Sequence, residues 1–367
     1  MAGGAEGHAL VVVRWIGSLV VVGADEGVHV DELGRIGEAS GLLAHAHART
    51  VVSPAELPES GHNASEEVVV VGGEALYDLV LEGDEELRAH PGGGPFNTAR
   101  TIARLGERVA YLGRLSTDRF GATLRRMLAD DGVLLDAVVE TDDPTTLALA
   151  EVDRDGSAVY RFYERATSAP GLTPEAALAA LPAGVGLLHV GTLGFEPMSA
   201  ALEAVVDELA GRALVAVDPN VRPGRIADPD GYRARLDRVI ARSDVVKASE
   251  EDLVWMDPDR DAPAAARALL DRGPAAVLLT RGAAGALVVG AGGDVEVPAP
   301  KIEVVDTIGA GDAFGGAFLA WWRSRDLPRD RLADLDTVVE ATRFATLVAA
   351  VTCERAGASP PHLSELP

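Results

Sequence analysis

From Val68 onward, short apolar runs alternate with longer amphipathic segments, and this alternation constrains the fold more than any other feature of the chain. The apolar runs occupy residues 68–71, 109–112, 187–190, 213–217, 245–247 and 276–280. The amphipathic segments occupy residues 99–105, 120–129, 199–209 and 263–270. Apolar runs that end in Gly or Asp and lead into helices are typical of a parallel sheet covered on both faces. We therefore predict an α/β domain with a doubly wound, mostly parallel sheet, helices on both faces, and ligands bound beyond the carboxyl ends of the strands.

One segment departs from this alternation and predicts a β-hairpin. Two alternating stretches, 145–153 and 157–164, flank the turn residues Arg154, Asp155 and Gly156. A hairpin outside a parallel sheet needs a surface to cover. It is therefore a lid over the site, a dimer contact or simple packing.

The first 67 residues differ from the rest of the chain. The apolar run at 9–23 is about 15 residues long and contains Arg14, whereas a membrane span needs about 20. It also lacks the basic start of a secretory signal, so we expect a strand or an interfacial segment. We predict a poorly ordered extension over 1–67 and a folded domain over 68–367.

The charge balance limits the partners. The chain has 33 Lys and Arg against 57 Asp and Glu, a net charge of −24. Such a charge repels nucleic-acid backbones and anionic lipid surfaces, so we expect neither as a partner. Cys353 is the only cysteine, which excludes an internal disulfide and predicts a reduced, cytoplasmic protein.

The segment 304–318 carries the strongest sign of chemistry. It passes from an apolar run through Gly309, Ala310 and Gly311 into a helical stretch. Small residues at a helix start let backbone N–H groups converge on an anion, and the helix dipole adds positive charge there. Asp312, in the first turn, can accept a proton from a hydroxyl that attacks phosphorus. The alternative is that Asp312 only caps the helix.

Two segments resemble the signatures of one family. Residues 306–314 (DTIGAGDAF) resemble the C-terminal signature of the ribokinase-like (PfkB-type) carbohydrate kinases, and residues 92–99 (GGGPFNTA), with Gly106, resemble the N-terminal one. Ser116 replaces one glycine of the family pattern. The resemblance covers about 68–361. It implies a ribokinase-like fold, a small β lid around 77–92 and 145–165, and dimerisation through the lid.

The resemblance also implies roles for individual residues. Asp312 would be the catalytic base, and the amides of Gly309, Ala310 and Gly311 the anion hole. The implied sugar site consists of Asp78, which the resemblance places at the end of the first strand, together with Gly93, Gly94, Asn97, Arg161 and Arg165. For the two arginines, a solvated hairpin face is an equal alternative.

The implied nucleotide site lies on two other segments. ATP would contact Lys247 and a turn that contains Thr280, Gly282 and Gly285. Magnesium, through waters, would be held by Asp252 or Glu251, unless this segment is simply an acidic helix start.

The family's potassium site would involve the Asp306 carboxylate and the Ile308 carbonyl. Pro361 stands where many members have a hydroxyl, so we leave the dependence on potassium open.

Two features narrow the substrate. The GGGPFN loop lacks the lysine that favours phosphorylated sugars, and the segments 188–193 and 218–223 resemble the fructokinase and ketodeoxygluconate-kinase branch. We expect transfer of the γ-phosphate of MgATP to a primary hydroxyl of a free sugar, with fructose first. The alternatives are ketodeoxygluconate, a nucleoside, or a non-catalytic sugar-sensing role. A dehydrogenase is disfavoured, because no G-x-G-x-x-G follows the first strand.

Overall fold

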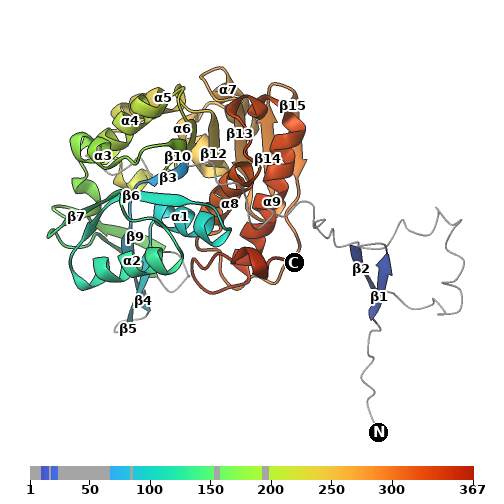
Figure 1. Ribbon diagram of the computed structural model, residues 1–367, viewed down its shortest axis with the longest axis horizontal. Helices are drawn as coiled ribbons and strands as arrows, with labels where there is room; N and C mark the ends of the chain where they lie inside the picture. Colours follow the sequence, from blue (N-terminus) through green and yellow to red (C-terminus); the bar gives the residue numbers. More distant parts are fainter. Residues whose placement is uncertain (1–9, 16–17, 24–66, 83–85, 153–157, 192–197) are drawn as a thin grey trace, which may run out of the picture. The chain divides into compact units, whose positions relative to one another are not determined.

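The computed structural model describes residues 10–15, 18–23, 67–82, 86–152, 158–191 and 198–367 (Figure 1). The chain divides into a unit at 1–57, together with Pro367, and a unit at 58–366. In the first unit, β1 (Leu10–Trp15) and β2 (Ser18–Gly23) pair as an antiparallel hairpin. Most of the apolar run near the N-terminus therefore forms strands, and apart from Glu67 the rest of the predicted extension lies outside the described residues.

A nine-stranded sheet forms the centre of the second unit, with the order β15-β14-β13-β12-β11-β10-β3-β6-β7. Its strands are β3 (Val68–Gly72), β6 (Val109–Ser116), β7 (Val138–Thr141), β10 (Val185–Gly191), β11 (Leu214–Asp218), β12 (Val245–Ser249), β13 (Ala276–Thr280), β14 (Ala286–Gly290) and β15 (Gly293–Val297). All pairs from β7 to β13 are parallel, and β14 and β15 extend the sheet in antiparallel fashion. The predicted α/β class with a mostly parallel sheet is confirmed.

Helices cover both faces of this sheet, as the buried apolar runs require. One face packs against α3 (Pro174–Ala180), α4 (Met198–Leu209), α5 (Pro229–Ile240), α6 (Glu250–Met256) and α7 (Ala262–Leu270). The other packs against α1 (Gly94–Arg104), α8 (Ala310–Ser324) and α9 (Leu335–Cys353), and α2 (Arg119–Asp130) lies beside β6. Figure 1 shows α1, α8 and α9 packed together. No described helix has both the length and the apolar character that a bilayer crossing requires.

A second, four-stranded sheet stands apart from the main one. Its order is β5-β4-β8-β9, formed by β4 (Leu76–Glu82), β5 (Glu86–Gly92), β8 (Leu147–Val152) and β9 (Ala158–Tyr163). β8 and β9 pair antiparallel, which confirms the predicted hairpin, although its turn lies outside the described residues. Tyr77 of β4 packs against Phe120 of α2 with ring centroids 4.4 Å apart, and this contact attaches the four-stranded sheet to α2.

The strand order places a crevice where such sheets bind ligands. From β3 the chain continues to β6 on one side and later to β10 on the other, so the order reverses between β3 and β10. Pro95, at the start of α1, sits over this point: a Cβ on Gly73 would lie 2.3 Å from its Cγ, and one on Gly191 3.4 Å away. Helix α1 therefore begins at the reversal.

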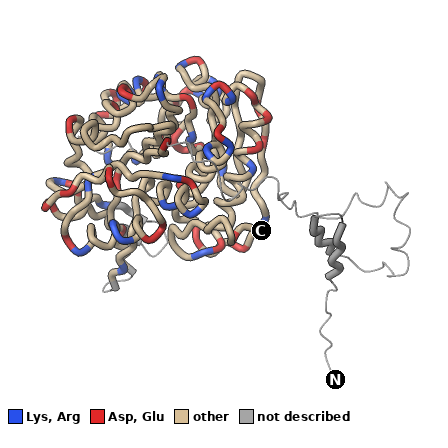
Figure 2. Tube along the Cα trace, in the orientation of Figure 1, with Lys and Arg blue, Asp and Glu red and all other residues tan. Residues whose placement is uncertain are grey.

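Charge is spread over the described chain, with Lys and Arg interspersed among Asp and Glu (Figure 2). Ion pairs join neighbouring outer helices, as where Arg242, just after α5, contacts Asp207 of α4 at 2.7 Å.

Adjacent glycines of α8 make a matched test of its packing on α1. A Cβ on Gly316 would lie 2.8 Å from the Cβ of Thr101, whereas one on Gly315 would have no neighbour within 4 Å. We expect Gly316→Ala to lower the free energy of unfolding by about 1–3 kcal/mol through overpacking. Gly315→Ala should raise it by about 0.5–1 kcal/mol, because alanine favours a helix. Urea denaturation measures both, and equal effects of the two substitutions would contradict the close approach.

Candidate active site

Asp312 lies at the start of α8 and is held by α1. Gly309 precedes the helix with φ +76°, and Asp312 occupies the first turn. The Nδ2 of Asn97 donates a hydrogen bond to Asp312 Oδ2 at 2.9 Å, and Thr98 Oγ1 donates to the Asp312 carbonyl at 3.4 Å. The two signature segments, more than 200 residues apart in sequence, therefore meet at this carboxylate.

The turn at Gly309 requires glycine for two reasons. Its φ lies in the left-handed region, which side chains disfavour. A Cβ there would also lie 2.7 Å from the Cβ of Ala358, in the segment after α9. The Ala310 amide donates to the Thr307 carbonyl at 3.2 Å, so within this turn the amides of Gly309 and Gly311 are the candidates for contact with a ligand.

A buried ion pair lies beside this turn. Lys247 Nζ contacts Asp218 Oδ2 at 2.7 Å, and both side chains are almost fully buried. A Cβ on Gly311 would lie 3.1 Å from Lys247 Nζ, which places the ammonium next to the 309–311 turn. Burial alone would lower the pKa of Lys247, but Asp218, Asp252 and Asp312 together raise it, with Asp218 contributing most. Lys247 therefore carries a positive charge beside the 309–311 turn.

The carboxyl group of Asp312 has a raised pKa. Burial raises its pKa from 3.8 to about 6, and the hydrogen bond from Asn97 and the charge of Lys247 offset only part of that effect. A carboxylate whose charged form is destabilised in this way is a stronger base than an ordinary aspartate.

Asp78 is a second carboxylate with a high pKa. The structure places it as the third residue of β4 rather than at the end of the first strand, because β3 already ends at Gly72. Burial raises its pKa to about 6, against the opposing charges of His90 and Arg222. A Cβ on Gly92 would lie 2.2 Å from Asp78 Oδ2, so the carboxylate lies over Gly92 and needs a glycine there.

The glycine loop lies between these two carboxylates in the sequence. Gly93 has φ +111°, and the Gly94 amide donates to Glu74 Oε1 at 3.1 Å, so Glu74 shapes the loop. Asn97 is 5% exposed, and its Oδ1 has no hydrogen-bond partner among the described residues. That oxygen is available to a ligand hydroxyl.

Arg222 is a site residue that the sequence analysis did not identify. It follows β11, and its charge lowers the pKa of both Asp78 and Asp312, so the guanidinium lies near both carboxylates. Arg161 and Arg165 are exposed on β9 and just beyond it. The sugar-site and solvated-face alternatives stay open for these two.

The acidic segment after β12 forms a helix start. Asp252 and Ser249 make a capping box at α6, and Asp252 Oδ1 also accepts the Val221 amide at 2.7 Å. Glu251 is exposed. In contrast, Asp218 Oδ1 is buried and has no hydrogen-bond partner among the described residues. That oxygen is available to a ligand, whereas both carboxylate oxygens of Asp252 already accept hydrogen bonds.

The remaining predicted residues occupy two turns near this edge of the sheet. Thr280 ends β13, next to β12, and Gly282 and Gly285 both have positive φ. The Asp306 carboxylate accepts the amide of Ile308 at 3.0 Å and that of Gly357 at 2.7 Å. Asp306 thus connects the chain just before the 309–311 turn to the segment after α9.

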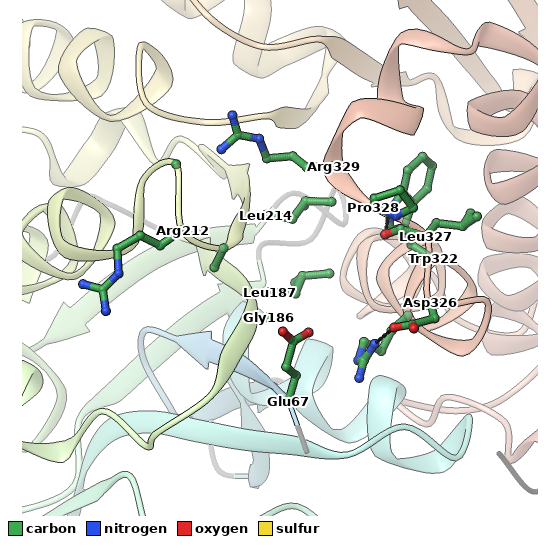
Figure 3. A pocket seen from close by; sticks show the side chains of 13 residues that line it. Glu67, Gly186, Leu187, Arg212, Leu214, Trp322, Asp326, Leu327, Pro328 and Arg329 are labelled. Carbon is green, nitrogen blue, oxygen red and sulfur yellow. Dashed lines mark hydrogen bonds and ion pairs between the residues drawn. The ribbon is translucent and has the colours of Figure 1, made fainter. Parts of the chain in front are cut away.

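A cavity of about 380 Å³ lies at the opposite end of the sheet (Figure 3). Gly186 and Leu214, near the amino ends of β10 and β11, line it, together with Trp322. Its arginines are engaged in ion pairs, such as that between Arg323 and Asp326 at 2.7 Å. The predicted residues all lie elsewhere, so this cavity is separate from the candidate site.

Comparison with known proteins agrees with this geometry. Residues 66–365 match the family described as pfkB family carbohydrate kinase. A fructokinase from Rhizobium leguminosarum bv. trifolii is 34% identical over 276 residues, which are 73% of this chain and 84% of that protein.

Solved structures give the same result. A fructokinase from Xylella fastidiosa with bound ATP matches with a TM-score of 0.75 and 28% identity, covering 81% of this chain and 96% of that one. A Vibrio cholerae fructokinase with fructose, ADP and calcium matches at 0.70 and 27%, covering 80% and 95%. An aminoimidazole riboside kinase from Salmonella enterica matches at 0.68 and 27%, covering 80% and 95%. This chain therefore belongs to the pfkB family of carbohydrate kinases and is a phosphotransferase that acts on a sugar.

Proposed function

We propose that this enzyme transfers the γ-phosphate of ATP to the primary hydroxyl of free fructose. The observation that carries the proposal is the placement of a high-pKa carboxylate, Asp312, between the sugar loop at Asn97 and the 309–311 turn with its adjacent ammonium, Lys247. Relatives named fructokinases, one of them solved with fructose and ADP, support fructose as the acceptor.

Each group has a task in this reaction. The amides of Gly309 and Gly311, together with Lys247, bind the γ-phosphate, and the triphosphate extends toward the 280–285 turn. Asp78 and the free Oδ1 of Asn97 hold sugar hydroxyls. Asp312 takes the proton of the attacking hydroxyl as its oxygen bonds to phosphorus, and the bond to the bridging oxygen breaks with its electrons leaving on ADP.

Magnesium, when bound, would neutralise phosphate charge. Carboxylate oxygens are the ligands that this ion prefers, directly or through water. Because Asp218 Oδ1 is buried without a partner among the described residues, whereas Asp252 is engaged in capping, we assign the metal-facing role to Asp218 rather than to Asp252 or Glu251.

Potassium and lid closure complete the proposal. A double mutant of a Vibrio cholerae fructokinase was solved with potassium, which supports potassium as a bound ion here, and the family resemblance assigns it to Asp306 and Ile308. The four-stranded sheet would close over the sugar and exclude water. Leu87 and Tyr163 are exposed on its strands, which suits the predicted homodimer.

Coupled ADP release with purified protein tests the reaction. The panel consists of fructose, ketodeoxygluconate, ribose, adenosine, aminoimidazole riboside and fructose 6-phosphate, each with MgATP. We expect turnover on fructose above about 1 s⁻¹, an ordinary value for a kinase. Preference for another acceptor would replace fructose, and ATP binding without turnover on any acceptor would favour a sugar sensor.

The two raised pKa values predict an acid limb in the rate. Both Asp78 and Asp312 must be ionised to act, and each becomes protonated below about pH 6. The logarithm of kcat/KM should therefore fall below pH 6 with a slope approaching 2, and with a slope near 1 in Asp78→Asn. A wild-type profile that stays flat down to about pH 4, as for ordinary carboxyl groups, would contradict the assignment.

Stability separates a base at position 312 from a helix cap. Because the pKa of Asp312 is about 6 when folded and 3.8 in the unfolded chain, its ionised form destabilises the fold, fully above pH 6 and less as pH falls toward 3.8. Asp312→Asn should therefore raise the urea midpoint at about pH 8, and by less at about pH 5.

The control for this experiment is a true cap. Asp118 accepts the Gly121 amide at 2.7 Å, and although burial opposes it, its hydrogen bonds lower its pKa. Asp118→Asn should therefore lose stability. If Asp312→Asn loses stability as well, burial does not destabilise the charge of Asp312, and the raised pKa is contradicted.

A further inference from the structure

A buried group of charges joins α1, α2 and the segment after α9. Arg100 Nε contacts Asp131 Oδ2 at 2.6 Å, and Arg104 Nε contacts Asp131 Oδ1 at 2.8 Å. The three side chains are 7%, 15% and 7% exposed. We define Arg100, Arg104 and Asp131 as the arginine clamp.

The local sequence does not favour this arrangement without a further reason. Arg100 and Arg104 are four residues apart on α1, where like charges repel. Asp131 is the C-cap of α2, where the helix dipole disfavours a negative charge. Burial also lowers the pKa of Arg100, which shows that its charge is costly there. Such a cluster calls for a partner that needs two guanidinium groups.

That partner is the chain after α9. Arg100 Nη1 donates to the Ala358 carbonyl at 3.3 Å, and Arg104 Nη1 donates to the Pro360 carbonyl at 2.7 Å. Pro360 and Pro361 have no backbone N–H, so this segment cannot form a regular ladder that would satisfy its carbonyls. The guanidinium groups do so instead.

The segment bound by the arginine clamp packs against the 309–311 turn. Ala358 lies directly against Gly309, where any Cβ would come within 2.7 Å of it. The neighbouring amide of Gly357 donates to Asp306, which also accepts the Ile308 amide. A shift of Ala358 would therefore let Gly309 move, and it would change the direction in which the backbone N–H groups of the 309–311 turn point.

Helix α1 links the clamp to the base as well. Asn97, Arg100 and Arg104 are spaced i, i+3 and i+7, so they lie along one face of the helix. Asn97 contacts Asp312, whereas Arg100 and Arg104 bind the 357–361 segment that packs against Gly309. One helix face thus sets both the base and the donors that a transferring phosphoryl group would meet.

We propose that Arg100, Arg104 and Asp131 are positioning residues that hold the 309–311 turn in its phosphate-binding geometry through the 357–361 segment. The activity readout below rests on the proposed function, whereas the exchange readout does not. Since small displacements of a catalytic group cost up to about 100-fold in rate, loss of the clamp should lower kcat without removing any group that touches substrate.

The test compares Arg104→Ala and the milder Asp131→Asn with a matched control, Arg242→Ala. Arg242 also pairs with a carboxylate, Asp207, and donates to a backbone carbonyl, that of Arg238, but it lies between α4 and α5. We expect kcat to fall about 10–100-fold in Arg104→Ala and less in Asp131→Asn, with the KM for fructose nearly unchanged. Low-millimolar guanidinium chloride should restore part of the rate to Arg104→Ala but not change Arg242→Ala.

Hydrogen exchange with mass spectrometry provides the second readout. Amides in 305–313 and 355–361 should exchange faster in Arg104→Ala and Asp131→Asn than in the wild type or in Arg242→Ala. Unchanged exchange at 305–313 in both clamp variants, or an Arg104→Ala turnover within about twofold of wild type, would overturn the proposal. If the wild-type protein phosphorylates no acceptor, the kinase reaction fails, and the exchange result alone decides on the clamp.

Discussion

The hydrogen bond from Asn97 to Asp312 is the contact around which the active site is built, because it joins the starts of α1 and α8 at one carboxylate. It can form only because the two helices pack closely, with Gly316 of α8 against Thr101 of α1. Helix α1 starts at the point where the strand order reverses, so the same contact places Asp312 at the edge of the sheet where ligands bind in sheets of this kind.

Local charge offsets the strongly acidic character of the chain at this point. A net charge of −24 would repel a nucleotide and a sugar phosphate alike. Lys247, paired with Asp218, lies beside the 309–311 turn, and Arg222 lies near both high-pKa carboxylates. A buried ion pair contributes little net stability, since desolvation opposes the attraction. Its placement beside the 309–311 turn fits the proposed role of Lys247 in binding phosphate.

Much of the fold followed from sequence pattern, and much of the site did not. The apolar runs gave the strands of the parallel sheet, because burial on both faces leaves a continuous apolar signal. No comparable pattern in the sequence indicated that β14 and β15 extend the sheet in antiparallel fashion. The prediction that Asp78 ends the first strand was wrong, because β3 ends at Gly72 and Asp78 lies in β4. The short turn between the two strands is not evident from the sequence.

Charged residues were the hardest to assign from sequence. The spacing Ser249-x-x-Asp252 is a capping-box pattern and could have identified Asp252 as a cap. No comparable signal marked Arg222 or the pairing of Lys247 with Asp218, because both depend on which strands are neighbours and in what register.

The central claim is that Asp312 is the base for phosphoryl transfer, and the most direct test is the chemical step itself. Rapid-quench single turnovers would compare wild-type protein and Asp312→Asn, with fructose and MgATP bound and the affinity for fructose measured separately. We predict that the rate of ADP formation falls about 10²–10⁴-fold, the usual contribution of a general base, while fructose binds with nearly unchanged affinity. A chemical step in Asp312→Asn that is as fast as in the wild type would contradict the account.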